Sequence, residues 1–223
     1  MVTYQYNALG NLLSKQTGNI QSLYTYNDGQ HLTGLENSNG DTVYSGHTYE
    51  YSLDGNRVAE VENTGMQKSY AYDGLGRLVY ETITDADLSL NTSYTYDNRG
   101  NRLSKTSNGK VTSYSYDANN RLTEEISQEN GSIAYYYDAN GNTISTIKGI
   151  YTTEGTPSIS MTSSPINLTT YTYDELNRLT SFTESGKNVS YTYGLDNLRK
   201  TKTVNNETTG FIWNGSNMVL LQC

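Results

Sequence analysis

Five aspartates spaced regularly along the chain are the residues best suited to chemistry. Each is followed three residues later by Gly or Asn, in the pattern Asp-x-x-Gly/Asn: Asp73, Asp97, Asp117, Asp138 and Asp174. Repeated carboxylates in short turns bind calcium in some proteins, but a calcium ion takes six to eight oxygen ligands. Each turn here offers one carboxylate, and Asn replaces it in other copies. We therefore interpret the aspartates as turn openers, whose side chains accept a backbone hydrogen bond two residues on.

The other reactive side chains lack a catalytic context. His31 and His47 stand alone, and no glycine-rich phosphate loop or Ser/His/Asp set occurs. Four arginines recur beside the turns, where pairing with Asp or stacking on tyrosine is favoured over anion binding: Arg77, Arg102, Arg121 and Arg178. The sequence thus predicts no catalytic residue, no cofactor site and no metal site, and a protein that is not an enzyme.

The elements that position these residues follow from an internal repeat. An aromatic-x-aromatic pair occurs ten times, and 18 of the 22 tyrosines belong to these pairs. The pairs stand at 4/6, 24/26, 49/51, 70/72, 94/96, 114/116, 135/137, 171/173, 191/193 and, as Phe-Ile-Trp, 211/213. Alternation of an aromatic with a small residue puts both rings on one face of a strand. The repeat therefore predicts strands at regular spacing.

Turn residues follow every pair. The residue four positions after the second aromatic is Gly in five copies and Asn in four, with Gln30 as the exception. Gly and Asn adopt positive φ at little cost. An Asp or Asn followed by such a residue predicts a hairpin loop built on a type I turn. The dipeptides Asn39-Gly40, Asn108-Gly109, Asn130-Gly131 and Ser185-Gly186 predict the turns at the opposite end of the strands.

The expected fold is all-β, with tandem β-hairpin repeats in a long antiparallel, curved or spiralling sheet. Residues 1–223 form a single array of about ten hairpins, with an irregular insert at 145–170 that contains both prolines. Three copies place their apolar residue one position late: "GNRV" (55–58), "GNRL" (100–103) and "GNTI" (141–144). A one-residue slip would turn the strand over, so a bulge or a longer turn is predicted in these three copies.

The stretches "YAYDGLGRL" (70–78), "YTYDNRGNRL" (94–103), "YSYDANNRL" (114–122) and "YTYDELNRL" (171–179) strongly resemble the YD repeats of the Rhs family. That family includes bacterial polymorphic toxins, wall-associated proteins, C subunits of insecticidal toxin complexes, and teneurins. The resemblance assigns structural repeat roles to Tyr70, Tyr72, Asp73, Gly76, Arg77, Leu78, Tyr94, Tyr96, Asp97, Gly100, Tyr114, Tyr116, Asp117, Asn120, Tyr171, Tyr173, Asp174 and Asn177.

The resemblance also implies a function. In the relatives the hairpins join into a hollow shell (YD-shell), which encloses a toxin in bacterial members, so a secreted or cell-surface location is implied. The Asp-Pro elements at which such shells cleave themselves do not occur here, because the only prolines are Pro157 and Pro165. That activity is therefore not carried over.

Composition bounds the partners. The net charge is −8, with no basic patch, which excludes nucleic acid as an expected partner. No run of 18 apolar residues and no signal peptide occur, so membrane insertion is not expected. Cys223 is the only cysteine, which excludes an intrachain disulfide. With 22 tyrosines and two phenylalanines, the core must be built from tyrosine, whose hydroxyl needs a partner.

We interpret the chain as a structural scaffold or wall segment of a shell around a toxin supplied elsewhere. Ten hairpins span ~95 Å at ~4.8 Å per strand, and a ring of roughly 30 Å diameter is too small for a folded cargo. Unpaired sheet edges predict self-association or pairing with other YD-repeat segments. One alternative is a carbohydrate- or cell-surface-binding module with exposed tyrosine faces. A β-propeller is disfavoured, because the spacings show no 40–50-residue super-period.

Overall fold

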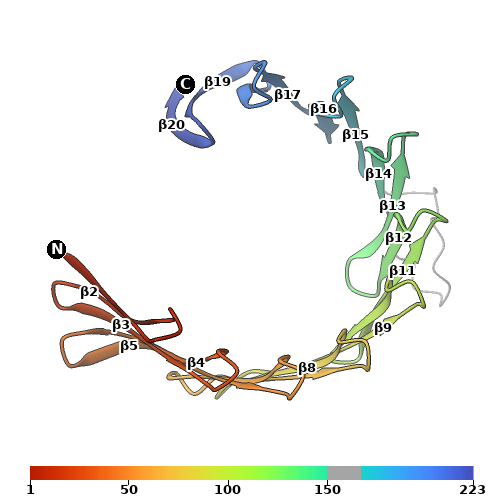
Figure 1. Cartoon of the computed structure of the whole chain (residues 1–223). Coiled ribbons are helices and arrows are strands. Elements are labelled where there is room, and N and C mark those ends of the chain that lie inside the picture. Colours follow the sequence, from red (N-terminus) through yellow and green to blue (C-terminus); the bar gives the residue numbers. More distant parts are fainter. Residues whose placement is uncertain (150–166, 223) are drawn as a thin grey trace. The chain divides into compact units, whose positions relative to one another are not determined.

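The computed structural model describes residues 1–149 and 167–222, and these residues form strands and turns without a helix (Figure 1). The predicted all-β fold is confirmed. No helix long and apolar enough to span a membrane occurs among the described residues. The chain divides into two compact units, Met1–Tyr96 with Ser104–Gly109, and Asp97–Leu103 with Lys110–Cys223.

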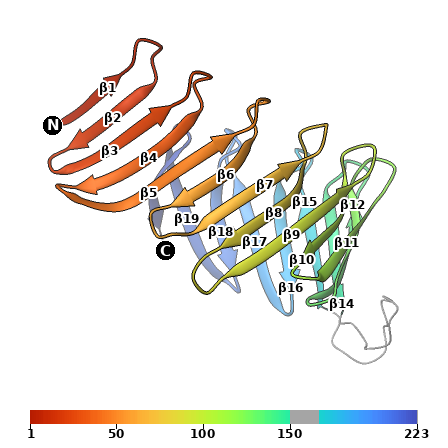
Figure 2. The same ribbon diagram turned by 90° about the horizontal axis from the view of Figure 1, so that it is seen from below.

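The first unit is an antiparallel sheet in which neighbouring strands are consecutive in the chain (Figure 2). Its strands are β1 (Val2–Tyr6), β2 (Leu12–Thr17), β3 (Ile20–Tyr26), β4 (Leu32–Asn39), β5 (Thr42–Tyr51), β6 (Arg57–Glu62), β7 (Gln67–Tyr72), β8 (Leu78–Thr84) and β9 (Ser89–Tyr96). Residues from both units belong to β10 (Arg102–Ser107).

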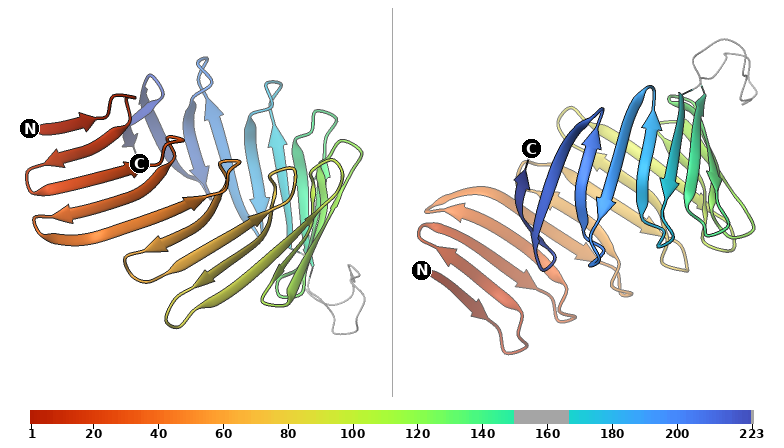
Figure 3. Two further views of the ribbon diagram at one scale, coloured as in Figure 1. Left: turned by 60° about the horizontal axis from the view of Figure 1, so that its bottom comes forward. Right: turned by 90° about the horizontal axis from the view of Figure 1, so that it is seen from above.

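The second unit repeats this pattern, and its strands lie side by side in chain order (Figure 3). They are β11 (Lys110–Tyr116), β12 (Leu122–Ser127), β13 (Gly131–Tyr137), β14 (Thr143–Gly149), β15 (Asn167–Tyr173), β16 (Leu179–Glu184), β17 (Lys187–Tyr193), β18 (Arg199–Val204), β19 (Glu207–Asn214) and β20 (Asn217–Gln222). Taken by itself, this sheet is curved, as the green to blue strands of Figure 1 show.

The turn after each of the first nine aromatic pairs has the predicted geometry. After the tenth pair the prediction is wrong, because Gly215 and not Asn217 has positive φ (+59°), and Trp213 pairs with Met218 across a shorter loop. The amide of Gly76 donates to the carbonyl of Asp73 at 2.9 Å, and the amide of Asp73 donates to the carbonyl of Arg77 at 2.9 Å. Gly76 has φ +74°, and the equivalent Asn120 and Asn177 have φ +61° and +58°. Even the exception, Gln30, adopts φ +63°. The strand pairing on both sides therefore imposes the left-handed conformation on a residue that does not favour it.

The turns at the opposite end also match the prediction. Asn108 and Gly109 both have positive φ, as do Ser185 and Gly186. Sequence reasoning missed other turns at this end, including those at Gly18 and Gly65 and the turn Asn205-Asn206, in which φ is +45° and +77°. Asn tolerates this region because its short polar side chain bonds locally.

The sequence predicts a bulge or a longer turn only in the copies at 55–58, 100–103 and 141–144. This prediction is wrong, because these copies have the same pairing as the regular ones. Tyr51 pairs with Arg57 and Tyr137 with Thr143, six residues on, as Tyr72 pairs with Leu78 in a regular copy. The same register shift precedes the second aromatic in all of them. No residue is inserted; instead, Arg or Thr occupies the sixth position after the second aromatic, where five other copies have Leu.

The insert predicted at 145–170 is partly resolved into regular structure. Ser145 in β14 pairs with Thr170 in β15, and Thr146 pairs with Thr169. Residues 150–166 lie outside the described residues. The organisation of the whole chain as one array of ten hairpins stays a prediction.

A valine at Gly76 is expected to destabilise the protein by about 1–2 kcal/mol, because a β-branched side chain is strained at φ +74°. A Cβ at Gly76 would meet only the Asn56 Nδ2 atom, at 3.9 Å, so backbone strain and not crowding sets the effect. Gly74→Val is the matched control, since Gly74 has open space and no positive φ. Urea unfolding of both variants checks the prediction, and equal losses would contradict it.

Candidate functional site

A hydrogen bond from the second aromatic of each pair after the first links one hairpin to the preceding one. The side chain donates to the backbone carbonyl of the sixth position in the preceding hairpin, at 2.7–3.1 Å. We call this series the hydroxyl ladder: Tyr26 to Leu12, Tyr51 to Leu32, Tyr72 to Arg57, Tyr96 to Leu78, Tyr116 to Arg102, Tyr137 to Leu122, Tyr173 to Thr143, Tyr193 to Leu179, and the Trp213 indole to Arg199. It supplies the partner that each of these tyrosine hydroxyls requires. The predicted core built from tyrosine is not found, because the buried hydrophobic residues in the described part of the chain are Tyr114, Ala134 and Val189.

The aspartate side chains hold the turns together. Asp73 Oδ1 accepts from the amides of Leu75 and Arg77 at 2.9 and 3.0 Å, and its Oδ2 accepts from Arg77 Nε at 2.7 Å. Asp117 and Asp174 make the same three bonds. Both carboxylate oxygens therefore bond within the turn.

Asp97 and Asp138 show a variant of this arrangement. The residue in the arginine position is Asn101 or Asn142, whose amide donates to the carboxylate Oδ2 at 2.9 or 2.8 Å. The predicted site residues thus occupy equivalent places in successive hairpins, as turn and strand residues of a structural repeat.

Acid is expected to destabilise the protein through these turns. The backbone amide of Arg77 is the main cause that lowers the pKa of Asp73 below the ordinary 3.8, and the Asn101 amide group does so for Asp97. The pKa values of Asp117, Asp138 and Asp174 are lowered similarly. A carboxyl group with a lowered folded-state pKa stabilises the fold above its unfolded pKa and loses that contribution as the pH falls through the folded pKa.

The melting temperature is therefore expected to be flat above about pH 5 and to fall steeply below the unfolded aspartate pKa of 3.8. Asp117→Asn, which keeps an acceptor oxygen, should have a lower melting temperature at pH 6 and a shallower acid slope. Calorimetric scans from pH 6 to pH 2 measure both. A wild-type curve without an acid slope would contradict the role of these carboxylates.

Arginine at the fifth position after the second aromatic connects its own turn to the next hairpin. The guanidinium of Arg121 lies 4.9 Å from the ring centroid of Tyr137 and donates to the carbonyl of Asp138 at 3.2 Å. Arg178 lies 4.8 Å from the ring of Tyr193 and donates to Asn197 Oδ1 at 2.9 Å. We call this place over the next second aromatic the guanidinium position.

Arg102 is not equivalent to the other three predicted arginines, because it stands at the sixth position. Its guanidinium lies 4.4 Å from the ring of Tyr114, the first aromatic of the next pair. Arg57 likewise covers Tyr70, at 5.3 Å. Arginine therefore caps a different ring depending on which of the two positions it holds.

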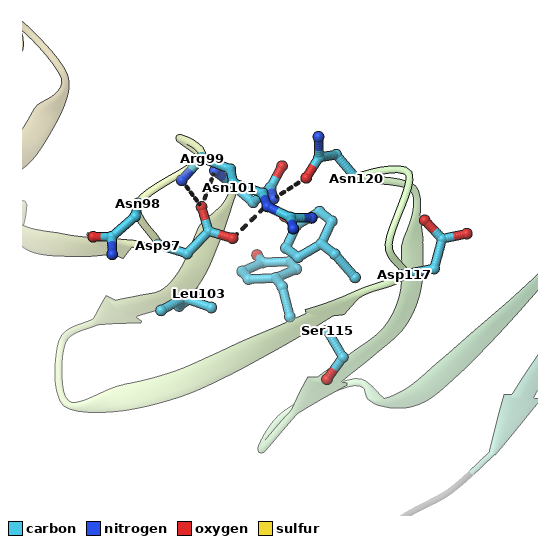
Figure 4. Close-up of a pocket in the computed structure, with 10 residues that line it drawn as sticks. Asp97, Asn98, Arg99, Asn101, Leu103, Ser115, Asp117 and Asn120 are labelled. Carbon is cyan, nitrogen blue, oxygen red and sulfur yellow. Dashed lines mark hydrogen bonds between the residues drawn. The ribbon is translucent and has the colours of Figure 1, made fainter.

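A pocket of about 500 Å³ opens in the second unit between two neighbouring turns (Figure 4). Asp97, Asn98, Arg99 and Asn101 of one turn and Asp117 and Asn120 of the next line it, together with Leu103, Tyr114, Ser115 and Tyr116. Asn101 Nδ2 bonds both to Asp97 Oδ2 and to Asn120 Oδ1, each at 2.9 Å. The pocket occurs where the fifth position holds Asn instead of Arg.

A buried charge cluster in the first unit was missed by sequence reasoning. Glu60 is 7% exposed and contacts Lys68 Nζ at 3.1 Å, Arg57 at 3.3 Å and His47 Nδ1 at 3.4 Å. Lys68 also bonds to Glu62 at 2.7 Å, and this bond is the main cause that raises the pKa of Lys68 and lowers that of Glu62. Lys68 and Arg57 together supply two positive charges for the two carboxylates, so the cluster is a set of ion pairs.

Comparisons with known proteins agree with the repeat and the fold. The RHS Repeat family matches residues 103–133. The tRNA3(Ser)-specific nuclease WapA of Bacillus spizizenii is 35% identical over 129 residues, and the tRNA nuclease WapA of Bacillus subtilis strain 168 is 33% identical over 129 residues. These alignments cover 57% and 56% of the chain but 5% of each nuclease.

The fold is similar to that of crystallised toxin proteins. The structure of TcdB2-TccC3-Cdc42 matches with a TM-score of 0.71 at 16% identity, over 94% of this chain and 13% of that one. The structure of TcdB2-TccC3 without its hypervariable C-terminal region gives 0.68 at 18% identity, over 95% and 13%. The YD motif, the hairpin sheet and these likenesses together lead to one conclusion. The chain resembles the YD-repeat proteins of the Rhs family in its repeat motif and in its fold.

Proposed function

We propose that the chain is a wall segment of a YD-repeat shell that encloses or presents a toxin or effector supplied elsewhere. The hydroxyl ladder is the observation that carries this proposal. It uses the side chain of one hairpin to satisfy the backbone of the preceding one, in the same way at every step from Tyr26 to Trp213. A bond pattern that involves only nearest neighbours allows hairpins to be added without a change of design, as in other repeat proteins. Such a fold is suited to building extended walls.

The partner that the first edge would take is another YD-repeat segment. All five residues of β1 are exposed, and Tyr6, the second aromatic of its pair, is 59% exposed. Among the described residues, no acceptor bonds to the Tyr6 hydroxyl, although every later second aromatic tyrosine has one. A preceding hairpin would supply both the missing strand ladder and the carbonyl.

The cargo is proposed from the relatives. The WapA relatives are tRNA nucleases, this chain matches 5% of their length, and its residues 103–133 match the RHS Repeat family. We infer that the chain belongs to the wall and not to the nuclease, and that it works outside the cell, as shell-borne toxins do. Glycan binding by the tyrosine faces stays a prediction, which a glycan array giving no saturable signal would exclude.

Light scattering of the full chain across a concentration series tests whether the exposed edge strand β1 pairs with another chain. The weight-average mass is expected to rise above 24.8 kDa with concentration. Tyr4→Lys, on exposed β1, should suppress the rise because a charge on an edge strand opposes pairing. Leu53→Lys, at a fully exposed loop position, is the matched control and should leave the rise unchanged. A mass that is independent of concentration would overturn edge pairing.

A further inference from the structure

The repeats provide their own example of a bound arginine side chain. In three hairpins the guanidinium position is filled from within the chain, by Arg77 over Tyr96, Arg121 over Tyr137 and Arg178 over Tyr193, at 4.8–4.9 Å. The filled positions share a ring face and acceptors in the next turn. Arg121 donates to the carbonyl of Asp138, and Arg178 donates to the carbonyl of Gly194 and to Asn197 Oδ1.

At Asn101 the next hairpin presents the same ring and the same acceptor groups, but the arginine is absent. The ring of Tyr116 is the equivalent second aromatic, Asp117 supplies the equivalent carbonyl, and Asn120 corresponds to Asn197. Among the described residues, no guanidinium lies over Tyr116. The 500 Å³ pocket is lined by these three residues, because the short Asn101 side chain ends at Asp97 and Asn120.

The three other hairpins with Asn at the fifth position are less suitable. Beside Asn11, the turn opener is Asn7, which contributes no carboxylate. Asn177 Oδ1, beside Asn142, already accepts from both Asn140 and Asn142, at 3.1 and 2.8 Å, so both of its lone pairs are used. Asn120 Oδ1 accepts only from Asn101 among the described residues, which leaves one lone pair. Beside Asn56, the turn opener is Ser52, which contributes no carboxylate.

We propose that this pocket binds an arginine side chain presented by another polypeptide. The planar guanidinium would stack on the Tyr116 ring and donate to the Asp117 carbonyl and to Asn120 Oδ1, as the chain's own arginines do in the neighbouring repeats. Arg99, which also lines the pocket, is held by the bond from its Nη1 to the Ala118 carbonyl, and Arg102 lies over Tyr114. Because these two cations balance the aspartates, stacking and directional hydrogen bonds select the ligand, and net charge does not.

Two consequences follow for recognition. Lysine, a point charge without a planar fork, should bind much more weakly than arginine. The affinity of a single side chain should be low, with a dissociation constant on the order of 1 mM. Such a site would fix the alignment of the two polypeptides within a larger interface and would contribute little to the affinity by itself. The inference does not depend on edge pairing, because the pocket lies within the second unit.

The test titrates the full chain, labelled with ¹⁵N, with three probes: the peptides acetyl-Gly-Arg-Gly-amide and acetyl-Gly-Lys-Gly-amide, and free arginine. The arginine peptide is expected to shift the amide signals of residues 97–101 and 117–120 at least tenfold more strongly than the lysine peptide at equal concentration. Equal shifts from both peptides would overturn the guanidinium assignment. Stronger binding of free arginine than of the peptide would overturn the assignment to a polypeptide.

Asn101→Arg is the decisive variant, since it restores the residue of the neighbouring repeats and should fill the pocket from within. It is expected to abolish the peptide-induced shifts and to raise the melting temperature. Ser113→Arg adds the same charge at an exposed position of β11, the strand that carries Tyr116, and should preserve binding. Asn101→Lys should give no comparable stabilisation, which separates ring stacking from charge. Undiminished binding by a folded Asn101→Arg variant would show that the peptide binds elsewhere.

Discussion

Replacement of Tyr137 by alanine is expected to lower the free energy of unfolding by about 3 kcal/mol, as for other large aromatic residues truncated in a packed environment. The Tyr137 ring lies under the guanidinium of Arg121, and its hydroxyl donates to the Leu122 carbonyl at 2.7 Å. The substitution removes both contacts and exposes the boundary between two hairpins. Urea unfolding followed by circular dichroism measures the loss.

Two further variants separate the contribution of the ring from that of the hydroxyl. Tyr137→Phe keeps the ring and removes only the hydrogen bond of the hydroxyl ladder, and it is expected to lower the free energy of unfolding by about 1 kcal/mol. Tyr136→Ala is the matched control, because Tyr136 is adjacent in the chain but 47% exposed. A Tyr136 variant as unstable as the Tyr137 variant would show that the ladder does not determine stability.

Replacement of Lys68 by methionine is expected to cost about 2 kcal/mol, because it leaves the buried carboxylate of Glu60 short of a partner. Loss of one member of a buried ion pair costs roughly 3–5 kcal/mol when no other partner exists. Arg57 and His47 still contact Glu60 here, which sets the smaller value. Chemical denaturation at pH 7 provides the measurement.

The double variant Lys68→Met with Glu60→Gln should recover part of that loss, since the uncompensated buried charge is removed with its partner. Lys110→Met, at a salt bridge with Glu129 in which both side chains are more than half exposed, is the control and should change stability by less than about 0.5 kcal/mol. A Lys68 variant as stable as the Lys110 variant would contradict a significant role for the cluster.

The turns were predictable because they depend on local chemistry. Asp73 and Gly76 specify their hairpin loop through a side-chain acceptor and a permitted positive φ, both of which are properties of residue type. The acceptor of each tyrosine hydroxyl was not predictable, because the Leu122 carbonyl that serves Tyr137 belongs to a hairpin 15 residues away. The cluster around Glu60 was missed for the same reason, since strand register brings Lys68 opposite Glu60 and Glu62 opposite His47.

The arginine positions show a second reason why sequence alone did not predict the site. In "GRL" and "GNRL", alignment on the leucine makes the second motif look one residue longer, whereas the register of "GNRV" at Arg57 shows the same loop length. Aligned on the loop, Asn101 replaces an arginine, and Arg102 replaces a leucine. Only the strand pairing reveals this substitution, and with it the reason for the pocket beside Tyr116.

The hydroxyl ladder also has a direction. In every rung the acceptor carbonyl precedes the donor side chain in the chain, as Leu12 precedes Tyr26 and Arg199 precedes Trp213. A hairpin that leaves the ribosome therefore finds its docking surface already synthesised and folded, and needs nothing that comes later. The array can thus assemble vectorially from its N-terminus, one hairpin at a time, while synthesis continues. During such assembly each new hairpin covers the edge of the one before it, so no internal strand stays unpaired for long and the time available for mispairing there is limited.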